Sequence, residues 1–413
     1  MTLRFWPLLL SLVLSGADVA DVAAAVEAPP LDALIARAIA ETPDLRALEA
    51  RIAAAEARAS GAGGLPPTMT EFRLRRFNAP HSGERETMPE VMIRQPLLFP
   101  GKASARTAAS RAEVSVLEAR SRSLRQEVTR VVATYYASLY ETEQERRMLE
   151  TARELLVSMA KEAGTRYATT GGDLAAAARA EVEISHLDAR LLDLELARAS
   201  AAAGFGAFFR DDAASEWTVS SLPEITPELT TEIDSIVPRA ERAAPEVRVA
   251  EAELKAARAM RRMTGRERLP DLSIGAEVAK PRELDAEYTG MVVLELPLFS
   301  RRGAEVRAAD SEIVAAEAEL QNARARARAE AGRLRAVWSA MEAHLVLHGE
   351  QVLLQDQTAL ELARISYANG RGEFSAVLDA YRAWLDDRIL VASIRAERLV
   401  TWAEIRALTP AED

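Results

Sequence analysis

The chain has 413 residues, of which 49% are hydrophobic but only 5% aromatic, so one compact core filled with aromatic side chains is not expected. It contains no cysteine, which excludes disulfides, thiolate metal sites and lipid attachment at cysteine. Its formal charge of −11 argues against a nucleic-acid partner.

Residues 1–25 have the order of a secretory signal. Arg4 precedes the apolar run Phe5–Leu14, and the small residues Ala23, Ala24 and Ala25 follow. A membrane anchor is the alternative interpretation, but the run is shorter than the roughly 20 residues of a spanning helix. We therefore expect an exported protein. The remaining sequence has no other long apolar segment, so no spanning helix is predicted in it.

The first half of the mature chain predicts a helix, two strands and a long helical hairpin. Apolar residues at helical spacing cover Leu31–Ala59, and side chains alternate between apolar and polar over residues 68–77 and 88–95, as in strands with one apolar face. After RQPLLFPGK, a coiled-coil pattern runs from about Gly101 to about Ala168. It predicts a helix on the order of 100 Å long, which turns at ATTGGD and returns as a second helix to about Ala203.

The second half repeats this order. APEVRVAEAELKAARA, from Ala244, resembles TPDLRALEARIAAAEA, from Thr42, and strands are predicted at 271–278 and 288–296. LELPLFSRRG then takes the place of RQPLLFPGK, and a second rod runs from about Gly303 to Ala368 before the turn YANGRGEF and a last helix. We expect a mainly α chain with a small β part. It is made of two structural repeats, residues 26–222 and 223–413, each with the order helix, strand, strand, long helix, turn, helix.

Four strands with one apolar face cannot form an open sheet in lipid, because unpaired backbone groups at the edges are costly there. Bacterial barrels need at least about eight strands. Several chains are therefore expected to contribute strands to one barrel.

With these motifs in place, nearly all of the mature chain resembles the TolC family of outer-membrane efflux proteins. The resemblance rests on the duplication, on RQPLLFPGK and LELPLFSRRG, on the turns RYATTGGDL and SYANGRGEF, and on the helix starts Pro43-Asp44-Leu45-Arg46 and Pro245-Glu246-Val247-Arg248. Each motif alone is weak, but their order and recurrence are specific.

The resemblance implies a homotrimer with a twelve-stranded β-barrel in the outer membrane of a Gram-negative bacterium, continued by an α-helical barrel through the periplasm. It implies a passive exit duct of a tripartite efflux or type I secretion-like system, with a periplasmic adaptor protein and an inner-membrane transporter, for which the RND type is favoured. It implies neither an enzyme nor a cofactor. A periplasmic coiled-coil adaptor and a structural protein without a pore are the alternatives.

The first junction resembles that of the heavy-metal branch of the family, the CusC/CzcC type. Gln95, Pro96, Gly101, Lys102 and Arg106 carry this likeness. The alternative is a structural junction that metal and drug exporters share. The corresponding residues of the second junction are Pro297 and Gly303, and in both junctions Pro and Gly are expected to end a strand before a helix begins.

The family resemblance also implies a periplasmic gate near the second turn. Asp379 matches an acid of the constriction, but Ala376 and Gly372 stand where a second acid and a linking arginine are expected, so Arg371 is the candidate replacement. Tyr367 is a gate candidate or a packing residue in equal measure. For Asp379 the alternative is an ordinary solvated carboxylate.

The two turns are the expected adaptor contacts, although plain turn and helix-start chemistry explains the same residues. These candidates are Gly171, Gly172, Asp173, Gly370, Gly372 and Glu373. His344 and His348 lie four residues apart on one helix face and are weak metal candidates, since no further ligand adjoins them in sequence.

Overall fold

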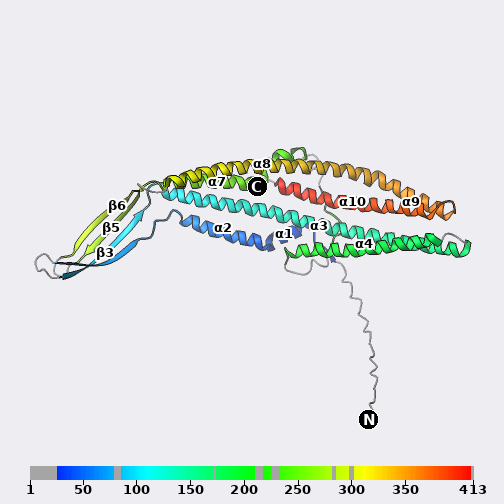
Figure 1. The fold of residues 1–413 in the computed structure, drawn as a ribbon, viewed down its shortest axis with the longest axis horizontal. Coiled ribbons are helices and arrows are strands. Elements are labelled where there is room, and N and C mark those ends of the chain that lie inside the picture. Colours follow the sequence, from blue (N-terminus) through cyan, green and yellow to red (C-terminus); the bar gives the residue numbers. More distant parts are fainter. Residues whose placement is uncertain are drawn as a thin grey trace, which may run out of the picture.

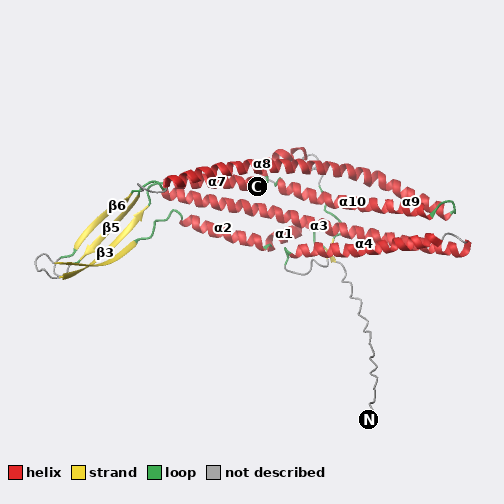
Figure 2. Ribbon diagram, viewed as in Figure 1, coloured by secondary structure: helices red, strands yellow, loops and turns green. Residues whose placement is uncertain are grey.

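The computed structural model describes residues 26–78, 85–170, 174–209, 217–225, 233–280, 285–296 and 302–410. The expected signal at 1–25 lies outside these residues. The chain is long and narrow: a small sheet lies at one end, helices run along the molecule, and the turn at residues 369–373 lies at the other end (Figures 1 and 2). The prediction of a mainly α chain with a small β part is confirmed. Among the described helices, none is both long and apolar enough to cross a membrane.

The elements occur in the same order in both halves, as Figure 1 shows by colour. The first half contains α1 (Leu31–Glu41), α2 (Pro43–Gly61), β2 (Met69–Asn78), β3 (Arg85–Leu97), α3 (Lys102–Thr170) and α4 (Leu174–Gly206). The second contains α6 (Ile236–Ala243), α7 (Pro245–Arg266), β5 (Asp271–Ala279), β6 (Glu287–Glu295), α8 (Arg302–Val346), α9 (Leu353–Ala368) and α10 (Phe374–Leu408). The exact boundary between the two repeats stays a prediction.

The single helix expected over Leu31–Ala59 is wrong, because α1 and α2 are separate. Thr42 between them is extended, with φ −58° and ψ 120°, and Pro43 is the first residue of α2. A proline ring clashes with a helical conformation of the preceding residue, so the chain must bend there. Ala244 and Pro245 make the same break between α6 and α7, with φ −54° and ψ 139° at Ala244.

The second rod also differs from the expectation of one regular helix. A π-helix, Leu347–Val352, separates α8 from α9, whereas α3 is a continuous helix of 69 residues. Such a wider turn inserts a residue into the helical repeat and is a common cause of bending. It leaves no mark in the spacing of the apolar residues along the chain.

The four long strands form one antiparallel sheet in the order β2-β3-β5-β6. The centre of the sheet therefore joins the two halves, since β3 pairs with β5. A second, two-stranded sheet pairs β1 (Val26–Glu27) in parallel with β4 (Trp217–Thr218).

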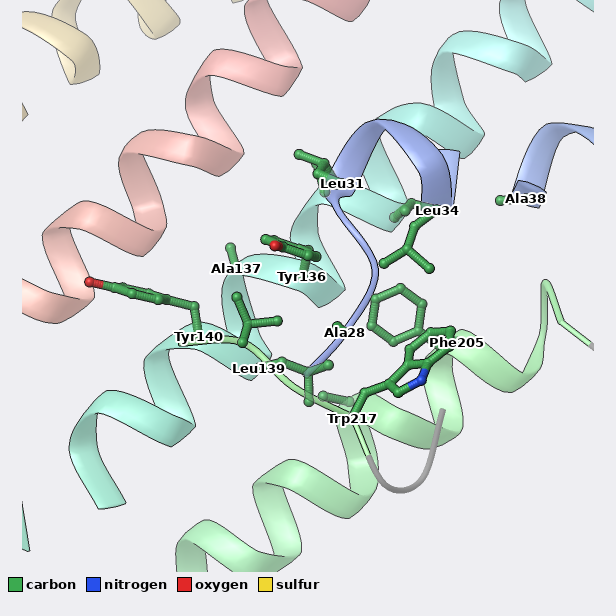
Figure 3. Packing of buried hydrophobic residues seen from close by; sticks show 14 of the residues in the cluster. Ala28, Leu31, Leu34, Ala38, Tyr136, Ala137, Leu139, Tyr140, Phe205 and Trp217 are labelled. Atoms are coloured by element: carbon green, nitrogen blue, oxygen red, sulfur yellow. The ribbon is translucent and has the colours of Figure 1, made fainter. Parts of the chain in front are cut away.

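The largest core lies midway along the molecule, where α1, α3, α4 and α10 meet (Figure 3). Phe205 is fully buried there, with its ring 5.6 Å from Trp217 and 5.5 Å from Tyr135. Leu34 and Leu399 come to the same core from opposite ends of the chain.

Two further cores fix the rest of the helices. One lies between the hairpins α3–α4 and α9–α10 and includes Leu156, Ile184 and Tyr381. The other packs α6 and the start of α7 against α8 and α10, around Trp338. The first of these holds the ends of the two hairpins against each other.

Candidate functional site

One face of the four-stranded sheet is apolar and exposed. The ladder aligns Phe72, Val91, Val278 and Tyr288 in a single row across the four strands. Of these side chains, Phe72 is 77% exposed and Tyr288 is 79% exposed. The large exposed residues of this apolar face are Phe72, Leu74, Val91, Ile93, Ile274, Val278, Tyr288, Val292 and Leu294.

The opposite face is mostly polar, because side chains alternate along each strand. Glu90 of β3 is buried there, and its carboxylate lies 3.5 Å from Arg73 and 3.7 Å from Arg75 of β2. The sheet thus separates an apolar surface from a surface of paired charges. None of the helices that the structure describes covers either face (Figure 2).

Strands β2 and β6 are the two edges of this sheet, and no other strand of the described chain pairs with them. Strand β2 has 10 residues and strand β6 has 9, which matches the roughly 9–11 residues of a tilted membrane-spanning strand. Free edges beside an apolar face are suited to pairing with strands of other copies.

The junction between β3 and α3 is closed by a cluster of ion pairs around one buried lysine. Gly101 has φ +90°, a conformation that favours glycine, and turns the chain into α3. The Lys102 side chain that follows is fully buried, and its Nζ lies 2.7 Å from Asp271 Oδ1 and 3.7 Å from Glu267 Oε2. Arg106 donates to Glu267 Oε1 at 2.6 Å.

These contacts join α3 of the first half to the end of α7 and the start of β5 in the second half. The hydrogen bond from Arg106 holds the pKa of Glu267 below its ordinary value, and the nearby charge of Lys102 acts in the same direction. Gln95 donates to the carbonyl oxygens of Pro66 and Pro96, both at 2.9 Å. Gln95, Lys102 and Arg106, which carry the heavy-metal likeness, thus have structural partners, as expected for a structural junction.

The expectation that Pro96 ends its strand is wrong. Pro96 lies within β3 and pairs with Ser273 of β5, while β2 begins only at Met69, opposite Arg94. Pro96 thus lies beyond the ladder between β2 and β3, where a missing N–H removes no bond to β2. Of the second junction, Pro297 lies outside the described residues, and Gly303 is the second residue of α8.

The second helical turn is tightly built. Gly370 has φ +70°, and a Cβ atom on Gly372 would lie 3.1 Å from the Cβ atom of Ser366. Tyr367 packs its ring against Phe374 at 5.4 Å and lies against the core between the hairpins. Glu373 precedes α10 and accepts a hydrogen bond from Ser375 at 3.2 Å. Gly171, Gly172 and Asp173 of the first turn lie outside the described residues.

The structure does not bring the predicted gate residues together as one cluster. Asp379 and Arg371 are exposed, whereas Tyr367 is half-buried. Sequence reasoning missed the ion pair beside them. Arg382 of α10 donates to the buried carboxylate of Glu183 in α4, at 3.1 Å for Nε and 2.5 Å for Nη2.

This ion pair ties the two helical hairpins together near their turns. The hydrogen bond from Arg382 to Glu183 raises the arginine pKa, and Asp379, one turn earlier, adds to the effect through its charge. Arg190 of α4 also faces Asp386 of α10 at 3.8 Å. No local pattern could have revealed these pairs, because α4 and α10 are far apart in sequence.

The two histidines stack with their ring centroids 5.7 Å apart. His348 Nδ1 lies 3.2 Å from Asp387 Oδ1. In the parts of the chain that the structure describes, no three histidine or acidic side chains are arranged to hold a metal ion. The histidine pair therefore has no complete ligand set there.

Comparison with known families adds to this geometry. Residues 236–410, from the start of α6 to the end of α10, match the family model described as outer membrane efflux protein. This segment is similar to an outer membrane efflux protein domain. The matched segment contains one complete set of two helices, two strands and a helical hairpin, so the outer membrane efflux protein model corresponds to one structural unit of the chain.

Solved structures extend the likeness to nearly the whole chain. The outer membrane protein VceC of Vibrio cholerae has a TM-score of 0.76 at 18% identity, over 92% of this chain and 96% of that chain. CusC, whose structures concern transmembrane channel formation, has a TM-score of 0.75 at 15% identity over 94% of each chain. The CmeC outer membrane channel of Campylobacter jejuni has a TM-score of 0.73 at 16% identity, over 93% of this chain and 87% of that chain.

At these identities the structural matches establish the fold, and the outer membrane efflux protein model adds a sequence match over residues 236–410. Together they confirm the resemblance to the TolC family. No curated protein matches the sequence.

Proposed function

We propose that this protein is the outer-membrane channel of a tripartite efflux system. Three copies contribute their sheets to one twelve-stranded barrel, and their helices continue it as a tube through the periplasm of a Gram-negative bacterium. The tube is a passive exit duct without enzymatic activity, and an inner-membrane transporter, with RND as the favoured type, supplies the energy. A periplasmic adaptor contacts the helical turns, including Gly370, Gly372 and Glu373.

The observation that carries this proposal is the sheet. It combines an exposed apolar face, a face of paired charges and two free edges at one end of helices on the order of 100 Å long. A structural coiled coil without a pore needs no such sheet. The solved relatives support the same function, since CmeC and OprN are described as outer-membrane channels.

Reconstitution of the purified full chain tests the proposal. We expect a trimer in detergent by light scattering and stepwise ion conductance in planar bilayers. A monomer without conductance would support a structural or adaptor role instead. Chemical cross-linking in outer-membrane fractions would show whether the trimer exists before extraction.

The cargo requires a separate experiment, because CusC and the other channels are equally remote in sequence from this chain. We propose heavy-metal cations as the first cargo to test, on the likeness of the first junction alone. A deletion strain would be grown on graded copper, silver, zinc, cobalt and cadmium, beside dyes, detergents and antibiotics. Sensitivity confined to metals would support metal export, and sensitivity to organic compounds would replace it with a general or drug-type exporter.

The Arg382–Glu183 pair is expected to help hold the periplasmic end closed. Arg382→Gln leaves the buried Glu183 carboxylate without its charged partner, which is unfavourable and should loosen α10 from α4. We expect a higher open probability and larger mean conductance in planar bilayers.

Arg364→Gln is the matched control for this prediction. Arg364 is also an exposed arginine of the second hairpin, but it faces Glu361 of its own helix at 3.9 Å. The Arg364→Gln variant should conduct like the unmodified protein. If Arg382→Gln does the same, the pair has no role in closing the channel.

A further inference from the structure

A group of three titratable side chains lies at the π-helix, away from the turns and the junction. His348 belongs to the π-helix, Asp356 to the first turn of α9, and Asp387 to α10. His348 Nδ1 is 3.2 Å from Asp387 Oδ1, and the side chains of Asp356 and Asp387 are in hydrogen-bond contact. The group therefore connects both arms of the α9–α10 hairpin above its turn.

The contact between the two aspartates needs a proton. Asp356 Oδ2 is shielded from solvent, and no donor in the described part of the chain offers it a hydrogen bond. Two ionised carboxylates can only accept hydrogen bonds, and they repel each other at close range. One proton placed between them turns the repulsion into a hydrogen bond.

The surroundings favour this proton on Asp356. His348 Nδ1 lies 3.2 Å from Asp387 Oδ1, whereas no donor of the described chain faces Asp356 Oδ2. The hydrogen bond with Asp387, followed by burial and by the charge of Asp387, raises the pKa of Asp356 to about 6, and His348 acts in the opposite direction. The proton would then be lost within the range of pH that an exported protein meets.

Other charged groups on the surrounding helices are mostly engaged elsewhere. On α8, Glu342 pairs with Arg398. On α10, Asp386 faces Arg190 of α4, and Arg388 lies over the ring of Trp384 at 4.8 Å. Glu350 of the π-helix is exposed, and His344 of α8 stacks on His348.

We propose that His348, Asp356 and Asp387 form a proton-dependent clip between the two helices of the α9–α10 hairpin, at the end away from its turn. The clip holds the helices together when Asp356 and Asp387 share a proton, and it loosens when both carboxylates are ionised. The π-helix makes this site a suitable hinge, because its wider turn already interrupts the regular helix between α8 and α9. The hairpin below the clip ends in Tyr367 and the second turn. An effect on channel opening rests on the proposed function, whereas the clip itself does not.

The direction of the pH effect follows from the bound proton. An acid with a higher pKa in the folded state holds its proton more tightly there, so folding stability from this group is full below its ordinary value of 3.8. It falls as the pH rises toward about 6 and is lost above that value. The clip should therefore be closed in mildly acidic solution and open in mildly alkaline solution.

Distance measurement between spin labels tests the clip directly, and the absence of cysteine allows labelling at two chosen positions. The labels would be attached in the double variant Gln357→Cys in α9 and Ala383→Cys in α10, because both of these residues are exposed. In the full-length chain we expect a narrow distance distribution in acid and a broader, longer one in alkali, with a midpoint near pH 6. No change across this range would overturn the proposal.

Asp356→Asn separates the clip from general effects of pH. Its amide is nearly isosteric and donates to Asp387 at every pH, so the narrow distribution should persist in alkali. His344→Gln is the matched control and should retain the unmodified response, because His344 stacks on the group without bonding to Asp387. If Asp356→Asn fails to fold by circular dichroism, Asp387→Asn replaces it, since that amide can donate to Asp356. A full pH response in the folded asparagine variant would overturn the clip even if the channel conducts normally.

Discussion

Val292→Arg is expected to prevent stable insertion of the protein into a lipid bilayer. Val292 lies on the apolar face of β6 and is 73% exposed in the single chain. An arginine facing lipid near the middle of the bilayer costs about 2–4 kcal/mol. In a symmetric trimer the same cost arises three times, which is comparable to the whole folding free energy of an ordinary domain.

Flotation of the purified protein with lipid vesicles, followed by bilayer conductance, measures this effect. Thr289→Arg is the matched control, because Thr289 is exposed on the same strand but points to the polar face. We expect the control to float and conduct, and Val292→Arg to remain in the soluble or aggregated fraction. Equal flotation of both variants would mean that the apolar face does not contact lipid.

Lys102→Ala is expected to destabilise the junction between sheet and helices by about 3 kcal/mol. The fully buried ammonium group lies between Asp271 and Glu267, so its removal leaves two carboxylates close together without their shared cation. It also leaves a cavity where the alkyl chain was. Thermal unfolding followed by circular dichroism should show the loss as a lower midpoint.

A second variant separates charge from packing at this position. Lys102→Met keeps most of the volume and removes the charge. Combined with Asp271→Asn, it removes the uncompensated carboxylate as well, while Glu267 keeps its bond from Arg106, and we expect this double variant to recover most of the lost stability. If Lys102→Met alone is as stable as the unmodified protein, packing of the side chain outweighs its charge.

The order of elements could be predicted from sequence because each pattern is local. Alternation in residues 68–77 and 271–278 gives strands, and Pro with Gly punctuates the chain. The break at Thr42–Pro43 could also have been predicted, because the preference of a residue before proline for an extended conformation is a local rule. It was missed because apolar residues keep a helical spacing on both sides of it. The π-helix at Leu347–Val352 has no such signal in its side chains.

The contacts within the candidate sites could not be predicted in the same way. Lys102 meets Asp271, Arg382 meets Glu183, and Asp356 meets Asp387 only because separate helices and strands pack together. A charged residue on a long helix is ordinarily solvated, and nothing in its neighbours along the chain distinguishes a partner in space. The family likeness pointed to the second turn, and the ion pair that ties the hairpins lies beside it.

The central core has a consequence for how the chain folds. It contains Ala28 and Leu31 near the start of the described chain, Trp217 in the middle and Ala403 near the end. No part of the chain shorter than nearly its full length can complete this core, so its closure depends on contacts very distant in sequence, which form slowly. Synthesis of α10 must therefore precede final folding, and until then the apolar surfaces of α1 and α3 remain exposed to aggregation or to holding chaperones.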